Sequence, residues 1–87
     1  MNSRALKRFW RMYEGLNPDI RREAREAYAL FAKDPLHRHL HFKELRYRPG
    51  YWSVRITYSY RAVCKRDGDT AYWLWIGSHA AFDRDFS

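Results

Sequence analysis

The chain has 87 residues, which is enough for one small domain with a single core and excludes a second domain. Hydrophobic residues make up 46% of it and aromatic residues 18%, so the composition excludes a disordered chain. The net charge of +7 favours a phosphate backbone or an acidic protein as partner, without choosing between them. The single cysteine, Cys64, excludes an internal disulfide. With no signal peptide and no apolar run of membrane-spanning length, we expect a soluble cytoplasmic protein without membrane contact.

Two amphipathic helices are predicted in the first part of the chain. After Ser3, a suitable N-cap, the apolar residues recur every three or four positions, at Leu6, Phe9, Trp10, Tyr13 and Leu16. Gly15 and Asn17-Pro18 end this helix, and the same Asn-Pro pair begins a second one. The apolar stripe of the second helix consists of Ile20, Ala24, Ala27, Tyr28 and Phe31. Because Pro35 disfavours helical geometry before it, we expect this helix to end near Lys33-Asp34 and the two to form a helical hairpin.

The connector from Leu36 to His41 has histidines at alternating positions, namely His37, His39 and His41. In an extended segment these side chains would share one side, a spacing that permits metal binding. Arg38 lies inside the cluster and no cysteine is near, so an exposed polar linker is the simpler interpretation. We therefore predict no metal site and no cofactor.

Four strands are predicted in the second half, at residues 42–47, 51–57, 60–65 and 70–76. Pro49-Gly50, residues 57–59 and Asp67-Gly68 are expected to form the turns, which gives an antiparallel meander. The fourth strand is apolar on both faces, so we expect it to be interior. Residues 80–87 are expected to form a last helical turn or a short tail. The predicted fold is of the α+β class, with a helical hairpin packed on a four-stranded antiparallel sheet.

Alternation in the second strand separates an apolar face from a basic one. Trp52, Val54 and Ile56 point to one side, and Arg55 points to the other. If the helical hairpin covers the apolar face, Arg55 lies on the open face, where Arg61 of the next strand can join it. The alternative is that both arginines are solvated strand residues.

Two arginines with a histidine at the end of a strand suit phosphodiester chemistry. Guanidinium groups bind phosphate at two points, and the imidazole of His79 exchanges a proton near neutral pH. Because RNA carries its own nucleophile in the 2′-hydroxyl, its cleavage needs a base, an acid and cationic stabilisation but no metal. Further candidates are Lys43 and Glu44, as proton acceptor or phosphate contact, and Phe82, as a stacking platform. Each also has a structural interpretation, as a strand-end histidine, an exposed charged pair or a core aromatic.

The order of these elements resembles the RelE/ParE superfamily of toxins from bacterial type II toxin-antitoxin systems. The resemblance runs from about Phe9 to Phe86. It rests on the two helices followed by Asp34-Pro35, Phe42-Lys43-Glu44-Leu45, Trp52-Ser53-Val54-Arg55-Ile56, Tyr60-Arg61-Ala62 and Trp75-Ile76-Gly77-Ser78-His79.

This resemblance implies a toxin held inactive by a cognate antitoxin. Many members cut messenger RNA, often on the ribosome, which inhibits translation. Carried over to matching positions, Arg55 and Arg61 are phosphate and transition-state contacts. His79 looks like the C-terminal histidine of the RNA-cleaving branch, and Phe82 approximates the aromatic residue after it. The resemblance thus implies a metal-independent messenger RNA endoribonuclease, an mRNA interferase.

Two departures from the family pattern bear on these expectations. Family members usually begin with a strand, whereas helical periodicity here starts almost at Met1, so we expect that strand to be absent or reduced. The sheet edge left open would be available to an antitoxin or to a second copy, giving a hetero-oligomer or a homodimer. In addition, Phe82 can stack but cannot transfer a proton, which would leave catalysis mainly to His79.

Two other functions stay open on the sequence. The family contains members that inhibit DNA gyrase without cutting RNA, and a fold does not decide between the two activities. The third possibility is an inactive member that only binds a partner or nucleic acid.

Overall fold

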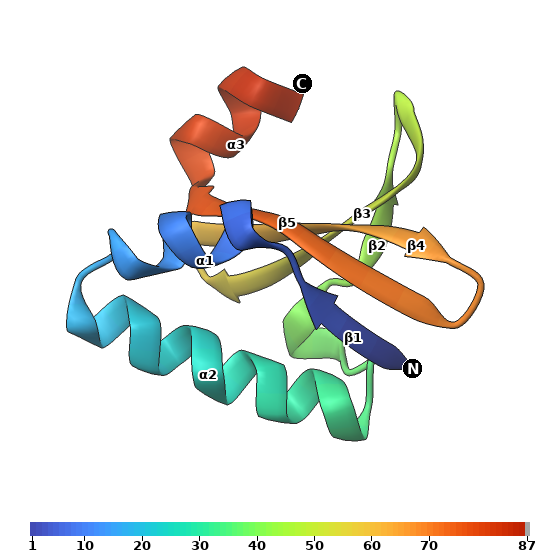
Figure 1. Cartoon of the computed structure of the whole chain (residues 1–87), viewed down its shortest axis with the longest axis horizontal. Helices are drawn as coiled ribbons and strands as arrows, with labels where there is room; N and C mark the ends of the chain where they lie inside the picture. The colour runs from blue at the N-terminus through green and yellow to red at the C-terminus, as the bar shows by residue number, and fades with distance from the viewer. Residues whose placement is uncertain (87) are drawn as a thin grey trace.

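A computed structural model of the protein describes residues 1–86. In chain order its elements are β1 (Asn2–Ala5), α1 (Lys7–Glu14), α2 (Pro18–Lys33), the 3-10 helix η1 (Arg38–Leu40), β2 (Lys43–Leu45), β3 (Arg48–Thr57), β4 (Tyr60–Asp67), β5 (Thr70–Ser78) and α3 (His79–Phe86). The strands form one five-stranded sheet in the order β1-β5-β4-β3-β2. Figure 1 shows α2 beneath this sheet and α3 on its opposite side. The predicted α+β class is confirmed.

The sheet has five strands of mixed direction, which corrects the predicted four-stranded antiparallel sheet. The strand expected to be absent or reduced is present as β1, and its four residues pair in parallel with β5, from Asn2 beside Thr70 to Ala5 beside Trp73. Ser3 is therefore no helix N-cap, and its hydroxyl lies 3.3 Å from the indole Nε1 of Trp73. Four residues are too few to show alternation, so only pairing with β5 reveals this strand. The sheet edge that a missing first strand would have left open is therefore covered by β1.

The two helices follow β1 as a hairpin with a three-residue connection. The first begins at Lys7, later than predicted, because Leu6 is still extended and its N–H donates to the Trp73 carbonyl at 2.9 Å. Asn17 caps the second helix as predicted, its Oδ1 accepting from the Ile20 N–H at 3.0 Å. That helix ends at Lys33, as the Asp34-Pro35 sequence predicts.

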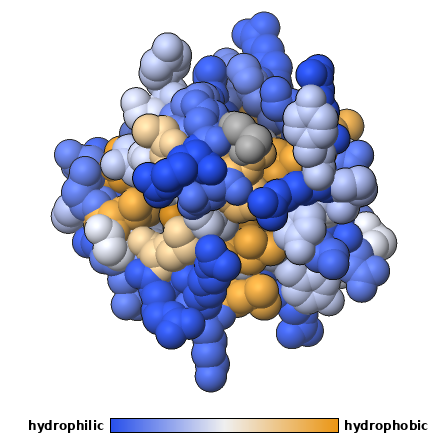
Figure 2. All heavy atoms as spheres, turned by 90° about the horizontal axis from the view of Figure 1, so that it is seen from above, coloured by the Kyte–Doolittle hydropathy of each residue, from blue (hydrophilic) through white to orange (hydrophobic). Residues whose placement is uncertain are grey.

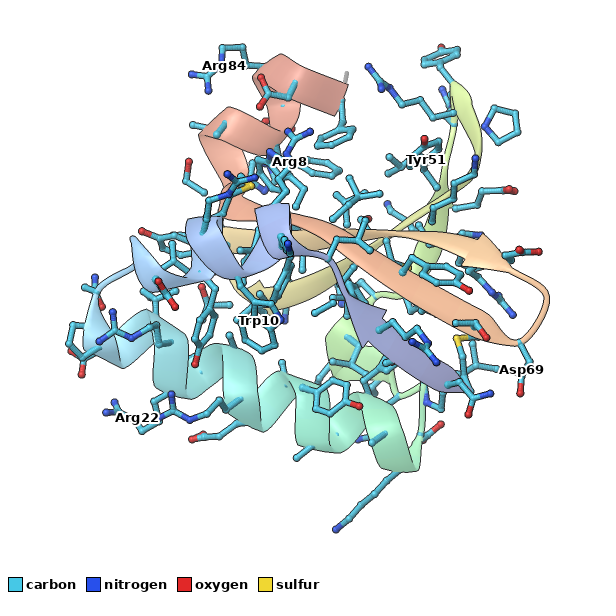
Figure 3. All side chains as sticks on the ribbon, viewed as in Figure 1. Arg8, Trp10, Arg22, Tyr51, Asp69 and Arg84 are labelled. Carbon is cyan, nitrogen blue, oxygen red and sulfur yellow. The ribbon has the colours of Figure 1, made fainter. Side chains whose placement is uncertain are left out.

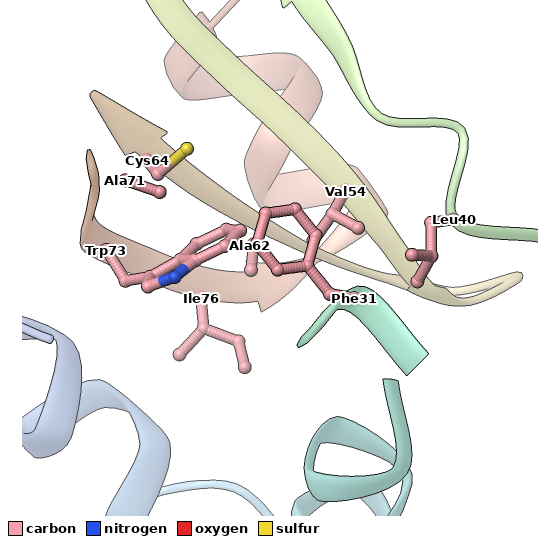
Figure 4. Packing of buried hydrophobic residues seen from close by; sticks show 8 residues of the cluster. All are labelled: Phe31, Leu40, Val54, Ala62, Cys64, Ala71, Trp73 and Ile76. Carbon is pink, nitrogen blue, oxygen red and sulfur yellow. The ribbon is translucent and has the colours of Figure 1, made fainter. Parts of the chain in front are cut away.

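The main core lies between the sheet and the helical hairpin. It contains the buried residues Phe31, Leu40, Val54, Ala62, Cys64, Ala71, Trp73 and Ile76, which Figure 4 shows at close range. The ring of Phe31 meets Phe42 and Trp73 edge to face, with centroids 5.0 and 5.3 Å apart. Cys64 is fully buried, and burial raises the pKa of its thiol to about 12. The apolar face of β3 is thus the face that the helices cover.

The hairpin between β2 and β3 turns earlier than the sequence predicts. Leu45 pairs with Arg48, so the turn consists of residues 46–47, and Pro49-Gly50 lies within β3. The register shifts between Glu44 and Leu45, and Gly50 has a φ of 88°, a conformation that glycine favours. Pro49-Gly50 therefore belongs to an irregular strand segment and not to the turn. The other two predicted turns, before Tyr60 and after Asp67, are confirmed.

A second, smaller core lies on the opposite face of the sheet, beneath α3. Its buried residues are Leu45, Val63 and Trp75, with Phe82 and Phe86 of α3 packed against them. The register shift between Val63 and Cys64 explains how β5 can be apolar on both sides, since Trp73 joins the main core and Trp75 the second. As predicted, β5 is interior. The tail expected at residues 80–87 is the helix α3 up to Phe86, and Ser87 lies outside the described residues.

The connector before β2 is exposed for most of its length, as expected, but it is not an irregular linker. Residues 38–40 form η1, which His37 caps, and Leu40 is fully buried in the main core. This burial fixes the path of the chain into β2. None of the helices in residues 1–86 has the length and apolar character needed to cross a membrane.

Candidate active site

Arg55 and Arg61 lie directly opposite each other on β3 and β4. They share the α3 face of the sheet, because the neighbouring pair Val54 and Ala62 is buried in the main core on the other face. Both arginines are partly exposed, and among residues 1–86 no carboxylate forms an ion pair with either of them. Two adjacent cations without a paired anion form a site for an anionic ligand.

The chain holds the Arg61 side chain in place. Its Nη1 donates to the carbonyl oxygens of Thr57 at 2.8 Å and Tyr60 at 3.1 Å, at the turn between β3 and β4. Burial, and then the charge of Arg55, lower the pKa of Arg61, while the charge of Asp83 acts in the opposite direction. Arginine stays protonated at any physiological pH, so Arg61 is a cation that is partly withdrawn from water and lies beside a second cation.

His79 is the first residue of α3 and lies beside this turn. Its N–H donates to the Ser59 carbonyl at 2.6 Å, which fixes the start of α3 against the turn. The imidazole Nε2 lies 3.1 Å from Oδ2 of Asp83, one helical turn later. Because Asp83 is also close enough to raise the pKa of Arg61, the His79–Asp83 pair and the arginines belong to one site. Because α3 packs on the second core, the start of this helix lies on the same side of the sheet as the arginines.

His41 is a site residue that our sequence interpretation missed, because we considered it only as one of three linked histidines. It precedes β2 with a left-handed φ of 46°, between the buried anchor Leu40 and the strand. Desolvation and then the positive charges of Arg55, Arg61 and Lys43 lower its pKa. The neutral imidazole is thereby favoured at neutral pH. No local pattern in the sequence marks His41, because its position depends on the burial of Leu40 and on its own left-handed backbone conformation.

The three connector histidines do not converge on one point. Nδ1 of His37 accepts a hydrogen bond from the His39 N–H at 3.1 Å, whereas His41 lies close enough to Arg55 and Arg61 for their charges to lower its pKa. Residues 1–86 contain no group of three or more His, Cys, Asp or Glu side chains arranged to hold a metal ion.

The structure separates Lys43 from Glu44. Lys43 pairs with Ser53, whose neighbour on the same face is Arg55, so the lysine joins the basic face. Glu44 pairs with Trp52, on the side of the main core, and its carboxylate accepts from the Gly50 N–H at 2.8 Å. The glutamate is thus held by the β2–β3 hairpin, and the lysine faces the site.

Phe82 combines the two roles that the sequence left open. It is half-buried, and its ring lies 6.2 Å from Trp75 and 6.4 Å from the His79 imidazole. One part of the ring therefore closes the second core, and the part near His79 borders the site. Figure 2 views this side of the molecule and shows apolar atoms in its middle with hydrophilic side chains around them.

Gly77 completes the row that runs from Arg55 through Arg61. A Cβ atom at this position would lie 2.9 Å from Cη2 of Trp75, closer than carbon atoms pack. The buried indole therefore lies over Gly77 and forms a rigid wall beside Arg61. The close approach of the indole explains why this strand position is a glycine.

The assembled site offers two arginines, a lysine, two histidines and a rigid apolar wall. Arg55 and Arg61 can bind a phosphodiester, and His41 and His79 can exchange protons. The two histidines come from different segments, one before β2 and one after β5. This arrangement is suited to acid–base chemistry on a phosphate ester.

Comparison with known proteins gives this fold its class, that of the toxins of toxin-antitoxin systems. The family description of the ParE-like toxin domain matches residues 18–84. The chain therefore belongs to this family, within the RelE/ParE superfamily that its sequence resembles. No curated protein matches the chain in sequence.

Several solved structures share the fold. The RelB-RelE antitoxin-toxin complex from Methanococcus jannaschii has a TM-score of 0.75 at 17% identity, over 95% of this chain and 98% of that one. The toxin-antitoxin complex RelBE2 from Mycobacterium tuberculosis has a TM-score of 0.70 at 26% identity, over 90% and 96%. The intact Escherichia coli RelBE complex has a TM-score of 0.67 at 15% identity, over 87% and 93%. At such identities the likeness concerns mainly the arrangement of helices and sheet.

Proposed function

We propose that this toxin is a metal-independent endoribonuclease that cuts messenger RNA and so inhibits translation. The observation that carries the proposal is the unpaired Arg55–Arg61 couple with a histidine from a separate segment on each side. A site built only to hold phosphate would not need two groups that exchange protons near neutral pH. The ribosome is the expected place of action, because messenger RNA is unfolded there.

In the proposed reaction the ribose 2′-oxygen attacks the adjacent phosphorus. Neutral His41 takes the proton of the 2′-hydroxyl, since its lowered pKa keeps the imidazole free to accept one. Arg55 and Arg61 stabilise the additional negative charge on the pentacoordinate phosphorane. The bond between phosphorus and the 5′-oxygen breaks, and protonated His79, oriented by Asp83, gives its proton to that oxygen. The products carry a 2′,3′-cyclic phosphate and a 5′-hydroxyl.

The test is a growth and cleavage assay on the full chain. Expression of the wild type is expected to stop growth and to create new messenger RNA ends that carry a 5′-hydroxyl. The variants His79→Ala and Arg61→Ala are expected to lose both effects. His39→Ala is the matched control, because this histidine is exposed and engaged with His37. Arrested growth with unchanged RNA ends, and with His79→Ala still toxic, overturns the proposal.

The second candidate function is inhibition of DNA gyrase, and the match to the ParE-like toxin domain supports it. Its action would need the basic face only as a binding surface, without proton transfer. DNA-damage signalling with intact RNA, unaffected by His79→Ala, is the outcome that would establish it. Harmless expression of the wild type would instead indicate an inactive member of the family.

We also propose that a cognate antitoxin with acidic character binds this toxin. Three of the structural neighbours are described as antitoxin-toxin complexes. The chain has a net charge of +7 and an apolar groove of about 550 Å³ between α1, α2 and the sheet, which is lined by Phe9, Trp10, Tyr28 and Ile56 among others. An amphipathic acidic segment would complement both features. Copurification of the neighbouring gene product with the wild type, but not with Trp10→Glu, would support this partner.

A further inference from the structure

A second row of side chains crosses the α3 face of the sheet, away from the arginine couple. The strand register aligns Tyr51 of β3 with Lys65 of β4, Lys65 with Tyr72 of β5, and Tyr72 with Arg4 of β1. Aromatic and basic side chains therefore alternate across four neighbouring strands. No role in the proposed reaction accounts for this pattern.

The row lies on the same side of the sheet as α3. Tyr51 packs against the second core, and Figure 3 shows it on the side of α3. Arg4 lies on this side as well, because residues alternate along β1 and the Ser3 hydroxyl contacts Trp73 on the side of the main core. Along β4 the row is four residues from Arg61, a separation of about 13 Å at the usual rise of a strand. Both rows thus open on one face, with the second core between them.

The row borders a hollow of about 620 Å³. Its lining includes Tyr51, Lys65, Tyr72, Leu6 and Leu74. The Lys65 Nζ lies 5.5 Å from the centroid of the Tyr51 ring, and Leu6 is 43% exposed. Asp67, two residues after Lys65, brings a negative charge to the end nearest the β4–β5 turn. The hollow combines accessible aromatic rings with cations and is limited by a carboxylate at one end.

We propose that this row is a second RNA-binding surface, which holds single-stranded RNA by stacking bases on Tyr51 and Tyr72 while Lys65 and Arg4 contact phosphates. Rings alternating with cations match the alternation of bases and phosphates in a single strand. A duplex would keep its bases stacked on one another and could use only the cations. The inference rests on the proposed function, since the row would bind a further part of the RNA substrate on the same face of the sheet.

The test measures binding of a short single-stranded RNA that cannot be cleaved. The probe carries 2′-O-methyl riboses and a 5′-fluorescein, and its anisotropy is followed with the full chain at several salt concentrations. Tyr51→Leu keeps an apolar side chain but removes the ring, so binding is expected to weaken about fivefold or more, whereas Tyr51→Phe retains it. Lys65→Gln is expected to reduce the slope of log K against log salt by about 0.7. The matched control is Lys33→Gln, which removes a charge at the end of α2, beneath the sheet.

Three results would overturn the surface. They are equal binding by Tyr51→Leu and Tyr51→Phe, equal binding by Lys65→Gln and Lys33→Gln, and a loss of binding with Tyr51→Leu that is as large for a hairpin duplex as for the single strand. Thermal unfolding of each variant checks that the fold is intact, and Lys65, which is exposed, can be changed without touching either core. Because the probe is uncleavable, a toxin that binds it but cuts no RNA would refute the proposed function alone. A cleaving toxin with normal binding by Tyr51→Leu and Lys65→Gln would refute this surface alone.

Discussion

The two faces of the sheet are built from alternate residues of the same strands and serve different purposes. The face that α1 and α2 cover is apolar across β3, β4 and β5, with Val54, Ala62 and Ile76 buried side by side. The face beneath α3 has an apolar centre, Val63 and Trp75, between the arginine row and the aromatic–basic row. One face is therefore organised for stability, and the other exposes charge that the fold does not neutralise.

This division has a stability penalty on the α3 face. Like charges placed directly opposite each other on neighbouring strands destabilise a sheet, by up to about 1 kcal/mol per pair. Arg55 and Arg61 occupy such positions, and no carboxylate among residues 1–86 forms an ion pair with them. An unfavourable arrangement held in place by hydrogen bonds from Arg61 to the turn is typical of a functional site.

The largest effect is expected from a substitution in the main core. Phe31→Ala removes a ring that is 2% exposed and contacts both Phe42 and Trp73, so the free energy of unfolding should fall by about 3–5 kcal/mol. Urea unfolding measures it. Leu36→Ala, at a side chain that is 78% exposed, is the control and should change little. A loss below about 1 kcal/mol for Phe31→Ala would contradict the role assigned to the helix-covered face.

On the other face, His41→Ala should reduce activity and leave the fold intact. Removal of a general base slows cleavage by about 10²- to 10⁴-fold. The side chain is exposed, so its loss should hardly affect unfolding. Cleavage rates on a model RNA, compared with His39→Ala, measure the effect. Equal rates for the two variants would remove His41 from the mechanism.

Gly77→Ala tests the contact between the second core and the arginine row. The new methyl group would meet the buried Trp75 indole at 2.9 Å, and overpacking of this kind costs about 1–3 kcal/mol. The variant should therefore unfold at a lower temperature and also cut RNA more slowly, because Trp75 must move beside Arg61. Thermal unfolding followed by circular dichroism and a cleavage assay give the two values. Wild-type stability would show that the indole is free to shift.

A smaller effect is expected where the helical hairpin is capped. Asn17→Ala removes the acceptor of the Ile20 N–H, and loss of such a cap destabilises a protein by about 1 kcal/mol. Asn17→Asp should retain the capping interaction and serves as the control. Urea unfolding distinguishes the two variants, and cleavage activity should be the same in both. A drop in activity with Asn17→Ala would mean that the two faces are coupled more strongly than their separate cores indicate.

The smallest expected effect is a shift in the pH dependence of cleavage. The pKa of His41 lies below its ordinary value, so the neutral base persists to lower pH and the acidic limb of kcat/KM should lie below that of a free imidazole. Desolvation contributes most, followed by the charge of Arg55. Arg55→Gln should therefore move this limb upward, in addition to slowing the reaction. A pH–rate profile records both, and a limb that stays in place would exclude the assigned base.

Sequence patterns located most of the elements but not the strand pairing. The Asn17-Pro18 cap, the stop at Pro35 and the hairpin at Asp67-Gly68 were predicted correctly, because each is a local preference of the backbone. The strand β1 was not, since four residues show no periodicity and become a strand only by pairing with residues some seventy positions away. The turn at residues 46–47 was misplaced for a related reason, because Gly50 marks a distortion within β3 as readily as a turn.

The candidate site likewise contains features that the sequence predicted and features that it did not. Alternation within one strand and the hairpin order predicted that Arg55 and Arg61 would share a face, and the register confirms it. The position of His41 depended on the burial of Leu40 and on a left-handed backbone conformation, neither of which a local pattern reveals. The pairing of Glu44 with Trp52, on the side of the main core, likewise depends on strand register.

The sequence by itself determined the α+β class, the helical hairpin, the interior fourth strand and the basic face, because these follow from periodicity and from residues with restricted backbones. Only the tertiary structure decided that β1 completes the sheet, that α3 covers the centre of the basic face, and that His41 and His79 flank the arginines from opposite ends of the strand meander. These features are contacts between segments far apart in the chain. Their free energy comes from burial and pairing in the folded state, and no local stretch of sequence contains it.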